Sequence, residues 1–193
     1  MALLTEAEVL ARAARTTTLR KSTALESLTE TASAGATFDV FLSHSSNEPE
    51  TILLGIKGYL EDSGLSVYVD RYTDPHLSPE EVTPGTAETL RGRLRASTSL
   101  LYVYSRHSKL SRWMPWELGF MDGAGKRIGI APVVETARSS FAGEQYLGLY
   151  PYLDRATIEG RNTWALWINR GIREYANYSE WVRGKETITR RAA

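Results

Sequence analysis

The chain of 193 residues carries 23 basic and 23 acidic side chains, so its formal net charge is zero, and 42% of its residues are hydrophobic. This balance argues against nucleic acid or a membrane surface as a partner. Cysteine is absent, which excludes disulfides, thiolate metal sites and cysteine nucleophiles and fits a cytoplasmic protein. No apolar run approaches the ~20 residues that span a bilayer, and the acidic N-terminal segment does not resemble a secretory signal.

The N-terminal part, residues 1–35, is expected to form a helical extension and a linker. A helix is predicted over residues 5–28 and begins with a capping box of Thr5 and Glu8. The threonine run 16–18 also allows two helices. Residues 36–183 are expected to form the main domain and residues 184–193 a C-terminal tail.

Apolar strands and short helices alternate from residue 38 onward. The expected strands are residues 38–43, 65–70, 100–104, 128–134 and a weak one near 155–159. The expected helices are residues 49–62, 86–96, 111–122 and 163–182. This order favours a parallel sheet with helices on both faces and right-handed crossovers.

Several kinds of site can be excluded from spacing. The glycine-containing run 123–129 leads from a predicted helix into a strand, the reverse of the dinucleotide fingerprint, and has Ile at position 128 where that fingerprint needs Gly. Its glycines instead indicate a helix end and a turn. The chain has no Gly-x-Ser-x-Gly nucleophile elbow. The three histidines lie in different loops without a repeated ligand spacing, so neither a metal site nor a cofactor is expected.

The helix predicted at 111–122 carries the most informative pair of residues. Trp113 and Glu117 are four residues apart and share a face. Glu117 therefore lies beside a large apolar plate, where a carboxylate acts at close range with water partly excluded. Pro115 is compatible with a helix only in the first turn, which supports a start near Ser111.

Three polar loops should meet at the carboxyl ends of the first three strands, where open α/β sheets bind ligands. They begin at Ser43, Asp70 and Ser105. Small hydroxyls and backbone N–H groups at such turns suit phosphate oxygens, and Arg71 can pair with a phosphate. Trp113 and its neighbours offer a flat wall for a base or nicotinamide ring.

Four segments together resemble Toll/interleukin-1 receptor (TIR) domains. Residues 38–45, Phe-Asp-Val-Phe-Leu-Ser-His-Ser, resemble the family's first-strand signature, residues 64–70 its second strand, and residues 71–85 its BB loop. Ser111-Arg112-Trp113 followed by Glu117 resembles the Ser-x-Trp-x-x-x-Glu pattern of NAD-cleaving TIR enzymes. The match spans about residues 38–170 and implies a flavodoxin-like, five-stranded parallel sheet. Size and layout look most like bacterial antiphage TIR proteins of the Thoeris type.

The resemblance implies an enzyme that cleaves the nicotinamide–ribose bond of NAD+, which is substrate and not cofactor. The product is expected to be a diffusible ADP-ribose-derived signal that activates a separate effector. Whether that product is ADP-ribose, a cyclic isomer or a conjugate is left open. Glu117 is implied as the catalytic carboxylate that stabilises the ribosyl cation. The implied substrate-binding residues are Ser43, His44, Ser45, Asp70, Arg71, Ser111 and Trp113.

Other interpretations compete with this one. Many TIR domains are interaction modules without catalysis, although a carboxylate at Glu117 beside Trp113 is not needed for a scaffold. A nucleoside 2-deoxyribosyltransferase would use a similar carboxylate on a similar fold, but the TIR-like first strand and second loop argue against it. Ser43 and Ser45 could merely cap the following helix. Self-association is expected through the 71–85 loop or the N-terminal helix.

Overall fold

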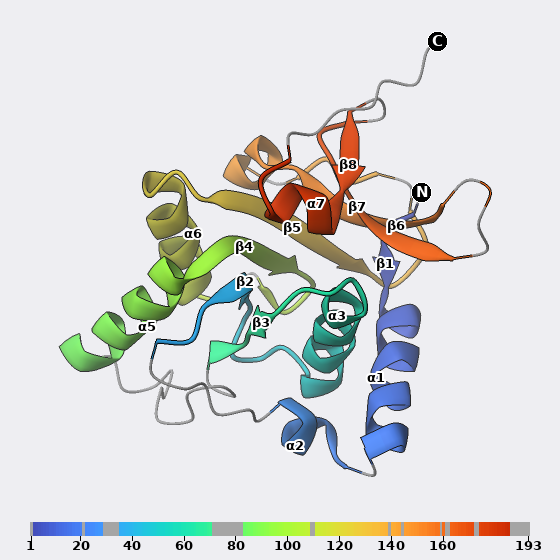
Figure 1. Ribbon diagram of the computed structural model, residues 1–193, viewed down its shortest axis with the longest axis horizontal. Coiled ribbons are helices and arrows are strands. Elements are labelled where there is room, and N and C mark those ends of the chain that lie inside the picture. Colours follow the sequence, from blue (N-terminus) through green and yellow to red (C-terminus); the bar gives the residue numbers. More distant parts are fainter. Residues whose placement is uncertain are drawn as a thin grey trace.

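Strands and helices alternate in the computed structural model, which describes residues 2–20, 22–28, 35–70, 83–108, 111–138, 140–143, 145–158, 160, 163–171 and 174–185. Figure 1 shows a central sheet with helices around it. The helices are α1 (Glu6–Arg20), α2 (Ala24–Leu28), α3 (Glu50–Asp62), α5 (Pro84–Ala96), α6 (Trp113–Gly123), the 3-10 helix η2 (Gln145–Leu149) and α7 (Tyr178–Val182). The strands are β1 (Leu4–Thr5), β2 (Phe38–Ser43), β3 (Val67–Tyr68), β4 (Ser97–Tyr104), β5 (Arg127–Val134), β6 (Tyr152–Thr157), β7 (Trp164–Asn169) and β8 (Tyr175–Asn177).

The strands of the described residues form one eight-stranded sheet in the order β3-β2-β4-β5-β6-β7-β8, with β1 paired to β5. Each neighbouring pair from β3 to β6 is parallel, whereas β7 and β8 join antiparallel at one edge. The expected α/β class with a central sheet is therefore confirmed. The expected number of five strands was wrong, because β1, β7 and β8 also join the sheet.

The helix predicted at 163–182 was also wrong. Leu166 and Ile168 are buried on β7 while Ala165 and Trp167, which alternate with them, are only half-buried, and this is the two-residue period of a strand. The strand pairs along the whole of β6, from Tyr152 to Thr157. These cross-strand contacts outweigh the helical spacing of the apolar residues. Among the described residues of the predicted helix, only 178–182 are helical, and the weak fifth strand lies at 152–157, three residues earlier than its expected start.

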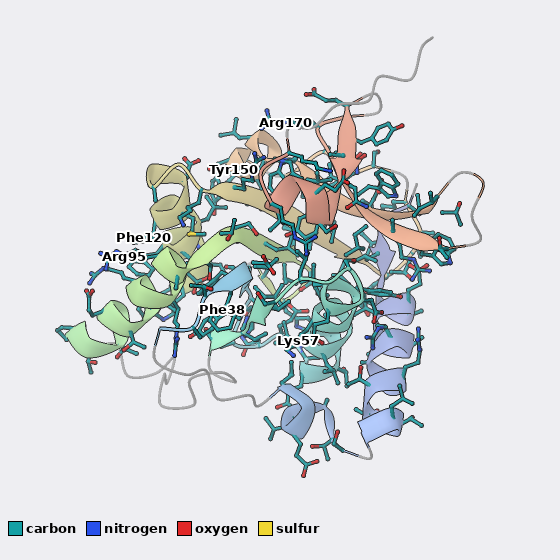
Figure 2. All side chains as sticks on the ribbon, viewed as in Figure 1. Phe38, Lys57, Arg95, Phe120, Tyr150 and Arg170 are labelled. Atoms are coloured by element: carbon teal, nitrogen blue, oxygen red, sulfur yellow. The ribbon has the colours of Figure 1, made fainter. Side chains whose placement is uncertain are left out.

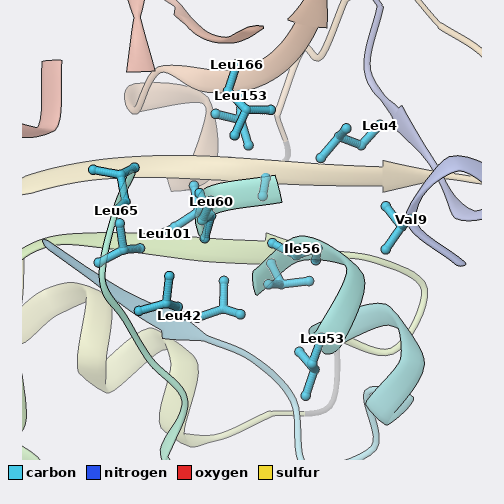
Figure 3. Close-up of a cluster of buried hydrophobic side chains, with 14 of the residues drawn as sticks. Leu4, Val9, Leu42, Leu53, Ile56, Leu60, Leu65, Leu101, Leu153 and Leu166 are labelled. Atoms are coloured by element: carbon cyan, nitrogen blue, oxygen red, sulfur yellow. The ribbon is translucent and has the colours of Figure 1, made fainter. Parts of the chain in front are cut away.

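One face of the sheet is covered by α1, α2, α3 and α7, whose apolar side chains share a single cluster with the strands. Figure 3 shows Leu4 and Val9 from the N-terminal segment beside Leu53 and Ile56 of α3 and Leu153 of β6. The first helix is held closely against α3, since a Cβ added at Gly55 would lie 2.1 Å from the Val9 carbonyl oxygen. Residues 4–28 therefore contribute to the same core as the main domain.

The opposite face is covered by α5 and α6, which bury a second apolar cluster. In the sheet β3 lies on one side of β2, and β4 lies on the other. The connection that leaves β2 for β3 and the connection that leaves β4 for β5 therefore run in opposite directions from the carboxyl ends of β2 and β4. Such a switch point is where open α/β sheets form a ligand crevice. In the register of these two strands, Ser43, the last residue of β2, pairs with Tyr102 in the interior of β4.

Two local predictions are confirmed. Thr5 and Glu8 form the capping box, with the Thr5 N–H donating to Glu8 Oε2 at 3.0 Å and the Glu8 N–H to Thr5 Oγ1 at 3.3 Å. Gly125, with a φ of 66°, makes the turn after α6. None of the helices in the described part of the chain is long and apolar enough to cross a bilayer.

Candidate active site

Glu117 occupies a core position of α6. The inward residues of this helix are Met114, Glu117, Leu118 and Met121, at the spacing of one buried stripe. The outer side carries aromatic rings that meet arginines of α5: Arg91 lies over Trp116, and Arg95 lies 5.6 Å from the centre of Phe120, a pair labelled in Figure 2. Because the aromatic side of α6 packs against α5, the Glu117 carboxyl on its other side faces the sheet.

The Glu117 side chain is 2% exposed and meets the end of β2. The Ser43 hydroxyl donates a 2.6 Å hydrogen bond to Glu117 Oε2. Burial, together with the nearby Asp70 carboxylate, raises the pKa of Glu117 to about 8, and the Ser43 hydrogen bond opposes both effects. A carboxyl with this pKa holds its proton at neutral pH until a positive charge arrives beside it. The site is therefore suited to a cation.

The end of β2 is also tied to the end of β3. The buried His44 ring places Nδ1 3.0 Å from the Leu42 carbonyl oxygen and Nε2 3.4 Å from Asp70 Oδ1. The structure thus brings Ser43, His44 and Asp70 together with Glu117. Arg71 and the rest of the 71–82 segment lie outside the described residues.

The other predicted residues have local partners. The Ser45 hydroxyl accepts a hydrogen bond from the Asn47 N–H at 3.2 Å, and the Ser111 hydroxyl accepts one from the Met114 N–H at 3.2 Å. Neither Ser43 nor Ser45 caps α3, which begins after Pro49 without a side-chain cap. Trp113 is half-buried and packs edge-on against Trp116. Its ring lies in the aromatic cluster at the start of α6.

A second buried carboxylate was not predicted from the sequence. Glu48, 3% exposed, accepts a 2.6 Å hydrogen bond from the Ser105 hydroxyl, which itself accepts one from the His107 N–H at 3.0 Å. Burial raises the pKa of Glu48, and the Ser105 hydrogen bond partly offsets that effect. This contact joins the loop after β2 to the loop after β4. The only sequence signal was that both loops follow neighbouring strands.

Tyr102 is a further residue that sequence reasoning missed. Its Cα is the partner of Ser43 in the parallel pair β2–β4, so the two side chains lie on the same face of the sheet. Tyr102 belongs to the cluster under α6 and is close enough to Glu117 for that carboxylate to raise its pKa, an effect that comes after burial and Tyr146. Among the described residues, no group of three or more His, Asp or Glu side chains could hold a metal ion.

Comparison with known proteins adds the family. No protein-family model matches the chain. The chain is 40% identical over 146 residues, 75% of its own length and 75% of the other protein, to the probable 3′ cyclic ADP-D-ribose synthase ThsB′ of Bacillus cereus (strain MSX-D12). It is 32% identical over 92 residues, 47% of its length and 24% of the other protein, to the putative cyclic ADP-D-ribose synthase TIR2 of Cytobacillus dafuensis. The expected family is thus confirmed: the chain belongs to the Thoeris-type TIR proteins.

Proposed function

We propose that this protein cleaves the bond between nicotinamide and ribose in NAD+ and converts the remaining part into a cyclic ADP-ribose signal in antiphage defence. The observation that carries the proposal is Glu117, a carboxyl buried at a core position of α6 and hydrogen-bonded to Ser43 at the carboxyl end of β2. A buried acid next to a second acid, Asp70, costs the fold stability, and groups perturbed in this way cluster at functional sites. The names of the two relatives support the same chemistry.

In the proposed reaction the bond between ribose C1′ and the nicotinamide nitrogen breaks, and its electron pair leaves with nicotinamide. The leaving group is cationic before cleavage and neutral afterwards, so it needs no general acid. The ribose that remains carries the positive charge as an oxocarbenium ion, as in glycoside cleavage. Glu117, as a carboxylate, would stabilise this charge at close range in a site without bulk water.

The protonation of Glu117 fits a cationic substrate. Because the pKa of Glu117 is about 8, much of the free protein holds a proton on this carboxyl at neutral pH. A positive charge beside the carboxyl favours the ionised form and lowers its pKa. Binding of NAD+ would therefore release a proton and place a carboxylate against the bond that breaks.

The remaining predicted contacts are part of the proposal. Ser43 and Asp70 act on Glu117 directly, and His44 holds Asp70 in place. Ser45, Ser111, Trp113 and Arg71 are proposed to line the substrate, with Arg71 outside the described residues. We further propose cytoplasmic action, self-association and a separate effector reached through the diffusible product.

The direct test is nicotinamide release from NAD+ by purified protein, comparing the parent with Glu117→Ala. We expect release from the parent and none from the variant. Glu88→Gln is the matched control, because Glu88 lies exposed on α5 and its ion-pair partners among the described residues are arginines of its own helix. The same comparison in phage-infected cells, with NAD+ and nucleotide products read by mass spectrometry, covers a requirement for a trigger.

Equal release from the parent and Glu117→Ala would contradict the catalytic role of Glu117. Absence of release both in vitro and in infected cells would favour a non-catalytic interaction module. Adding deoxynucleosides to the same assay separates NAD+ cleavage from deoxyribosyl transfer, since only the second would exchange bases on deoxyribose.

A further inference from the structure

Tyr102 lies on the sheet face that carries the candidate catalytic pair, Ser43 and Glu117. In the β2–β4 register it is the neighbour of Ser43, whose hydroxyl binds Glu117. The same row across the sheet continues from Tyr102 through Ile130 of β5 to Tyr152 of β6. These three residues belong to the apolar cluster under α6. Tyr102 is 4% exposed, so its ring closes the site from below against water.

A second tyrosine lies beside the first. The side chain of Tyr146 is within hydrogen-bond reach of the Tyr102 hydroxyl, and Tyr146 is 39% exposed, so it lies between the buried Tyr102 and solvent. It belongs to η2, whose next residue, Leu147, is buried and anchors the segment in the cluster under α6. The anchored helix η2 therefore holds Tyr146 beside Tyr102.

The backbone around η2 is built for this placement. Gly143 has a φ of 74°, and a Cβ there would lie 2.5 Å from the Gly148 backbone, so the two ends of the segment touch. Gln145, the first residue of η2, has a φ of 50°, a left-handed conformation that non-glycine residues seldom adopt. Such strain persists only where the surrounding structure fixes it, and it is frequent at functional sites.

The segment is also fixed to the helix that carries Glu117. The Tyr150 hydroxyl, directly after η2, faces the Asp122 carboxylate near the end of α6. Figure 2 labels Tyr150 on the side of the molecule where α6 lies. Side chains of this segment therefore reach both Tyr102 and the helix that carries Glu117.

We propose that Tyr102 and Tyr146 form a water-excluding wall that decides which nucleophile captures the ribosyl cation. This inference rests on the proposed function. When water attacks C1′, a C–O bond forms and a proton is released, giving ADP-ribose. When a nitrogen or hydroxyl of the same ADP-ribose attacks C1′, the product is cyclic, and a hydroxyl nucleophile likewise loses its proton. An aromatic wall over C1′ suppresses the first path and leaves the second.

The Tyr102 phenol suits an enclosing role and not that of a base. Burial, together with Tyr146 and Glu117, raises the pKa of the Tyr102 hydroxyl far above neutral, so the phenol stays neutral over the working range. A neutral phenol can donate a hydrogen bond to a ribose oxygen but does not activate water. The wall therefore orients and encloses the substrate without itself transferring the proton.

The experiment measures the ratio of ADP-ribose to cyclic product at equal nicotinamide release, under conditions in which the parent is active. Tyr146→Ala opens the wall from the exposed side, and Tyr102→Phe keeps the buried ring while removing its hydroxyl. Leu149→Ala is the control, since Leu149 lies in the same 3-10 helix and is 78% exposed. We expect Tyr146→Ala to raise the ratio several-fold, Tyr102→Phe to raise it less, and Leu149→Ala to leave it unchanged.

Methanol gives a second readout, because it captures the same cation by forming a C1′–O bond and losing its proton. We expect more O-methyl ADP-ribose from Tyr146→Ala than from the parent at equal nicotinamide release. An unchanged product ratio in Tyr146→Ala, or a parallel loss of nicotinamide and cyclic product, would overturn the proposal that the two tyrosines exclude water. So would a parent that makes ADP-ribose alone. No nicotinamide release from the parent would overturn the proposed function and, with it, this inference.

Discussion

Two of the buried carboxylates, Glu117 and Glu48, share one local arrangement and differ in their surroundings. Each accepts a 2.6 Å hydrogen bond from a serine hydroxyl at the carboxyl end of a parallel strand, Ser43 for Glu117 and Ser105 for Glu48. Burial raises the pKa of both. From the hydrogen bond alone, the two would be assigned the same role.

Their electrostatic neighbours separate them. His107 and His44 lie near Glu48 and favour its ionised form, whereas Asp70 lies near Glu117 and opposes ionisation. Among the described residues, Glu117 has no ion-pair partner of its own. Glu48 thus has histidines beside it and joins two loops, whereas the charged neighbour of Glu117 among the described residues is a second acid, and a cationic substrate can supply the missing positive charge. The neighbours, and not burial, distinguish a structural acid from a reactive one.

The largest expected effect comes from Glu117→Gln, which keeps the shape and the Ser43 hydrogen bond but removes the charge. Loss of a preorganised electrostatic contact of this kind costs a factor of about 10³ in rate. The same variant should be more stable than the parent. The folded-state pKa of Glu117 is raised, so its contribution to stability is full below the ordinary carboxyl pKa and is lost as pH rises toward about 8. At about 1.4 kcal/mol per pKa unit, the gain at pH 8 amounts to a few kcal/mol.

Thermal unfolding of the parent and Glu117→Gln at pH 5 and pH 8 measures this gain. The two melting temperatures should be close at pH 5 and clearly apart at pH 8. Glu88→Gln should show no such divergence, because Glu88 is exposed. A Glu117→Gln protein that is inactive but no more stable at pH 8 would mean that the carboxyl is not strained in the free protein.

The pH dependence of kcat/KM gives the next largest effect. If the carboxylate form of Glu117 is the active one, kcat/KM should rise with pH and level off near the pKa of about 8. Below that pKa it should fall about tenfold per pH unit, since this parameter reports ionisation in the free enzyme. The kcat profile should be flatter, because bound NAD+ favours the carboxylate. A kcat/KM that falls between pH 6 and pH 8 would require a protonated Glu117 instead.

Ser43→Ala should have a smaller effect in the same direction. The Ser43 hydrogen bond favours the Glu117 carboxylate, so its loss raises the pKa of Glu117 further. Hydrogen bonds to charged groups contribute about 1.5–3 kcal/mol, which corresponds to a loss in kcat/KM of about tenfold or more at pH 7. The pH profile should move to higher pH, and Ser43→Thr should restore it. An unshifted profile in Ser43→Ala would show that Ser43 does not act through Glu117.

The sequence was most informative where local pattern and tertiary role coincide. The strand at 38–43 was predicted with its observed bounds, and the spacing from Trp113 to Glu117 located the candidate catalytic acid. It was least informative where a distant partner decides. Apolar residues from Trp164 onward fit a helix as well as a strand, and only pairing with β6 selects the strand.

The same limit applies to the site. Ser43 was predicted because it ends an apolar strand, but its neighbour Tyr102 follows only from the register of β2 and β4. Glu48 reads as an ordinary loop charge, since its partner Ser105 is 57 residues away. Side chains that meet through register or loop convergence are therefore not visible in a single sequence, even when the strands that carry them are.

The smallest expected effect on catalysis comes from Glu48, and it tests the comparison most sharply. Glu48→Gln keeps an acceptor for the Ser105 hydroxyl, so nicotinamide release should change little. Glu48→Ala removes that acceptor and should lower the free energy of unfolding by about 1–3 kcal/mol in urea titrations, because a buried polar group loses its partner. If Glu48→Gln instead lost activity as fully as Glu117→Gln while remaining stable, both carboxylates would act on the substrate. The neighbouring histidines would then hold Glu48 ready for chemistry, and charge environment would no longer separate the two acids.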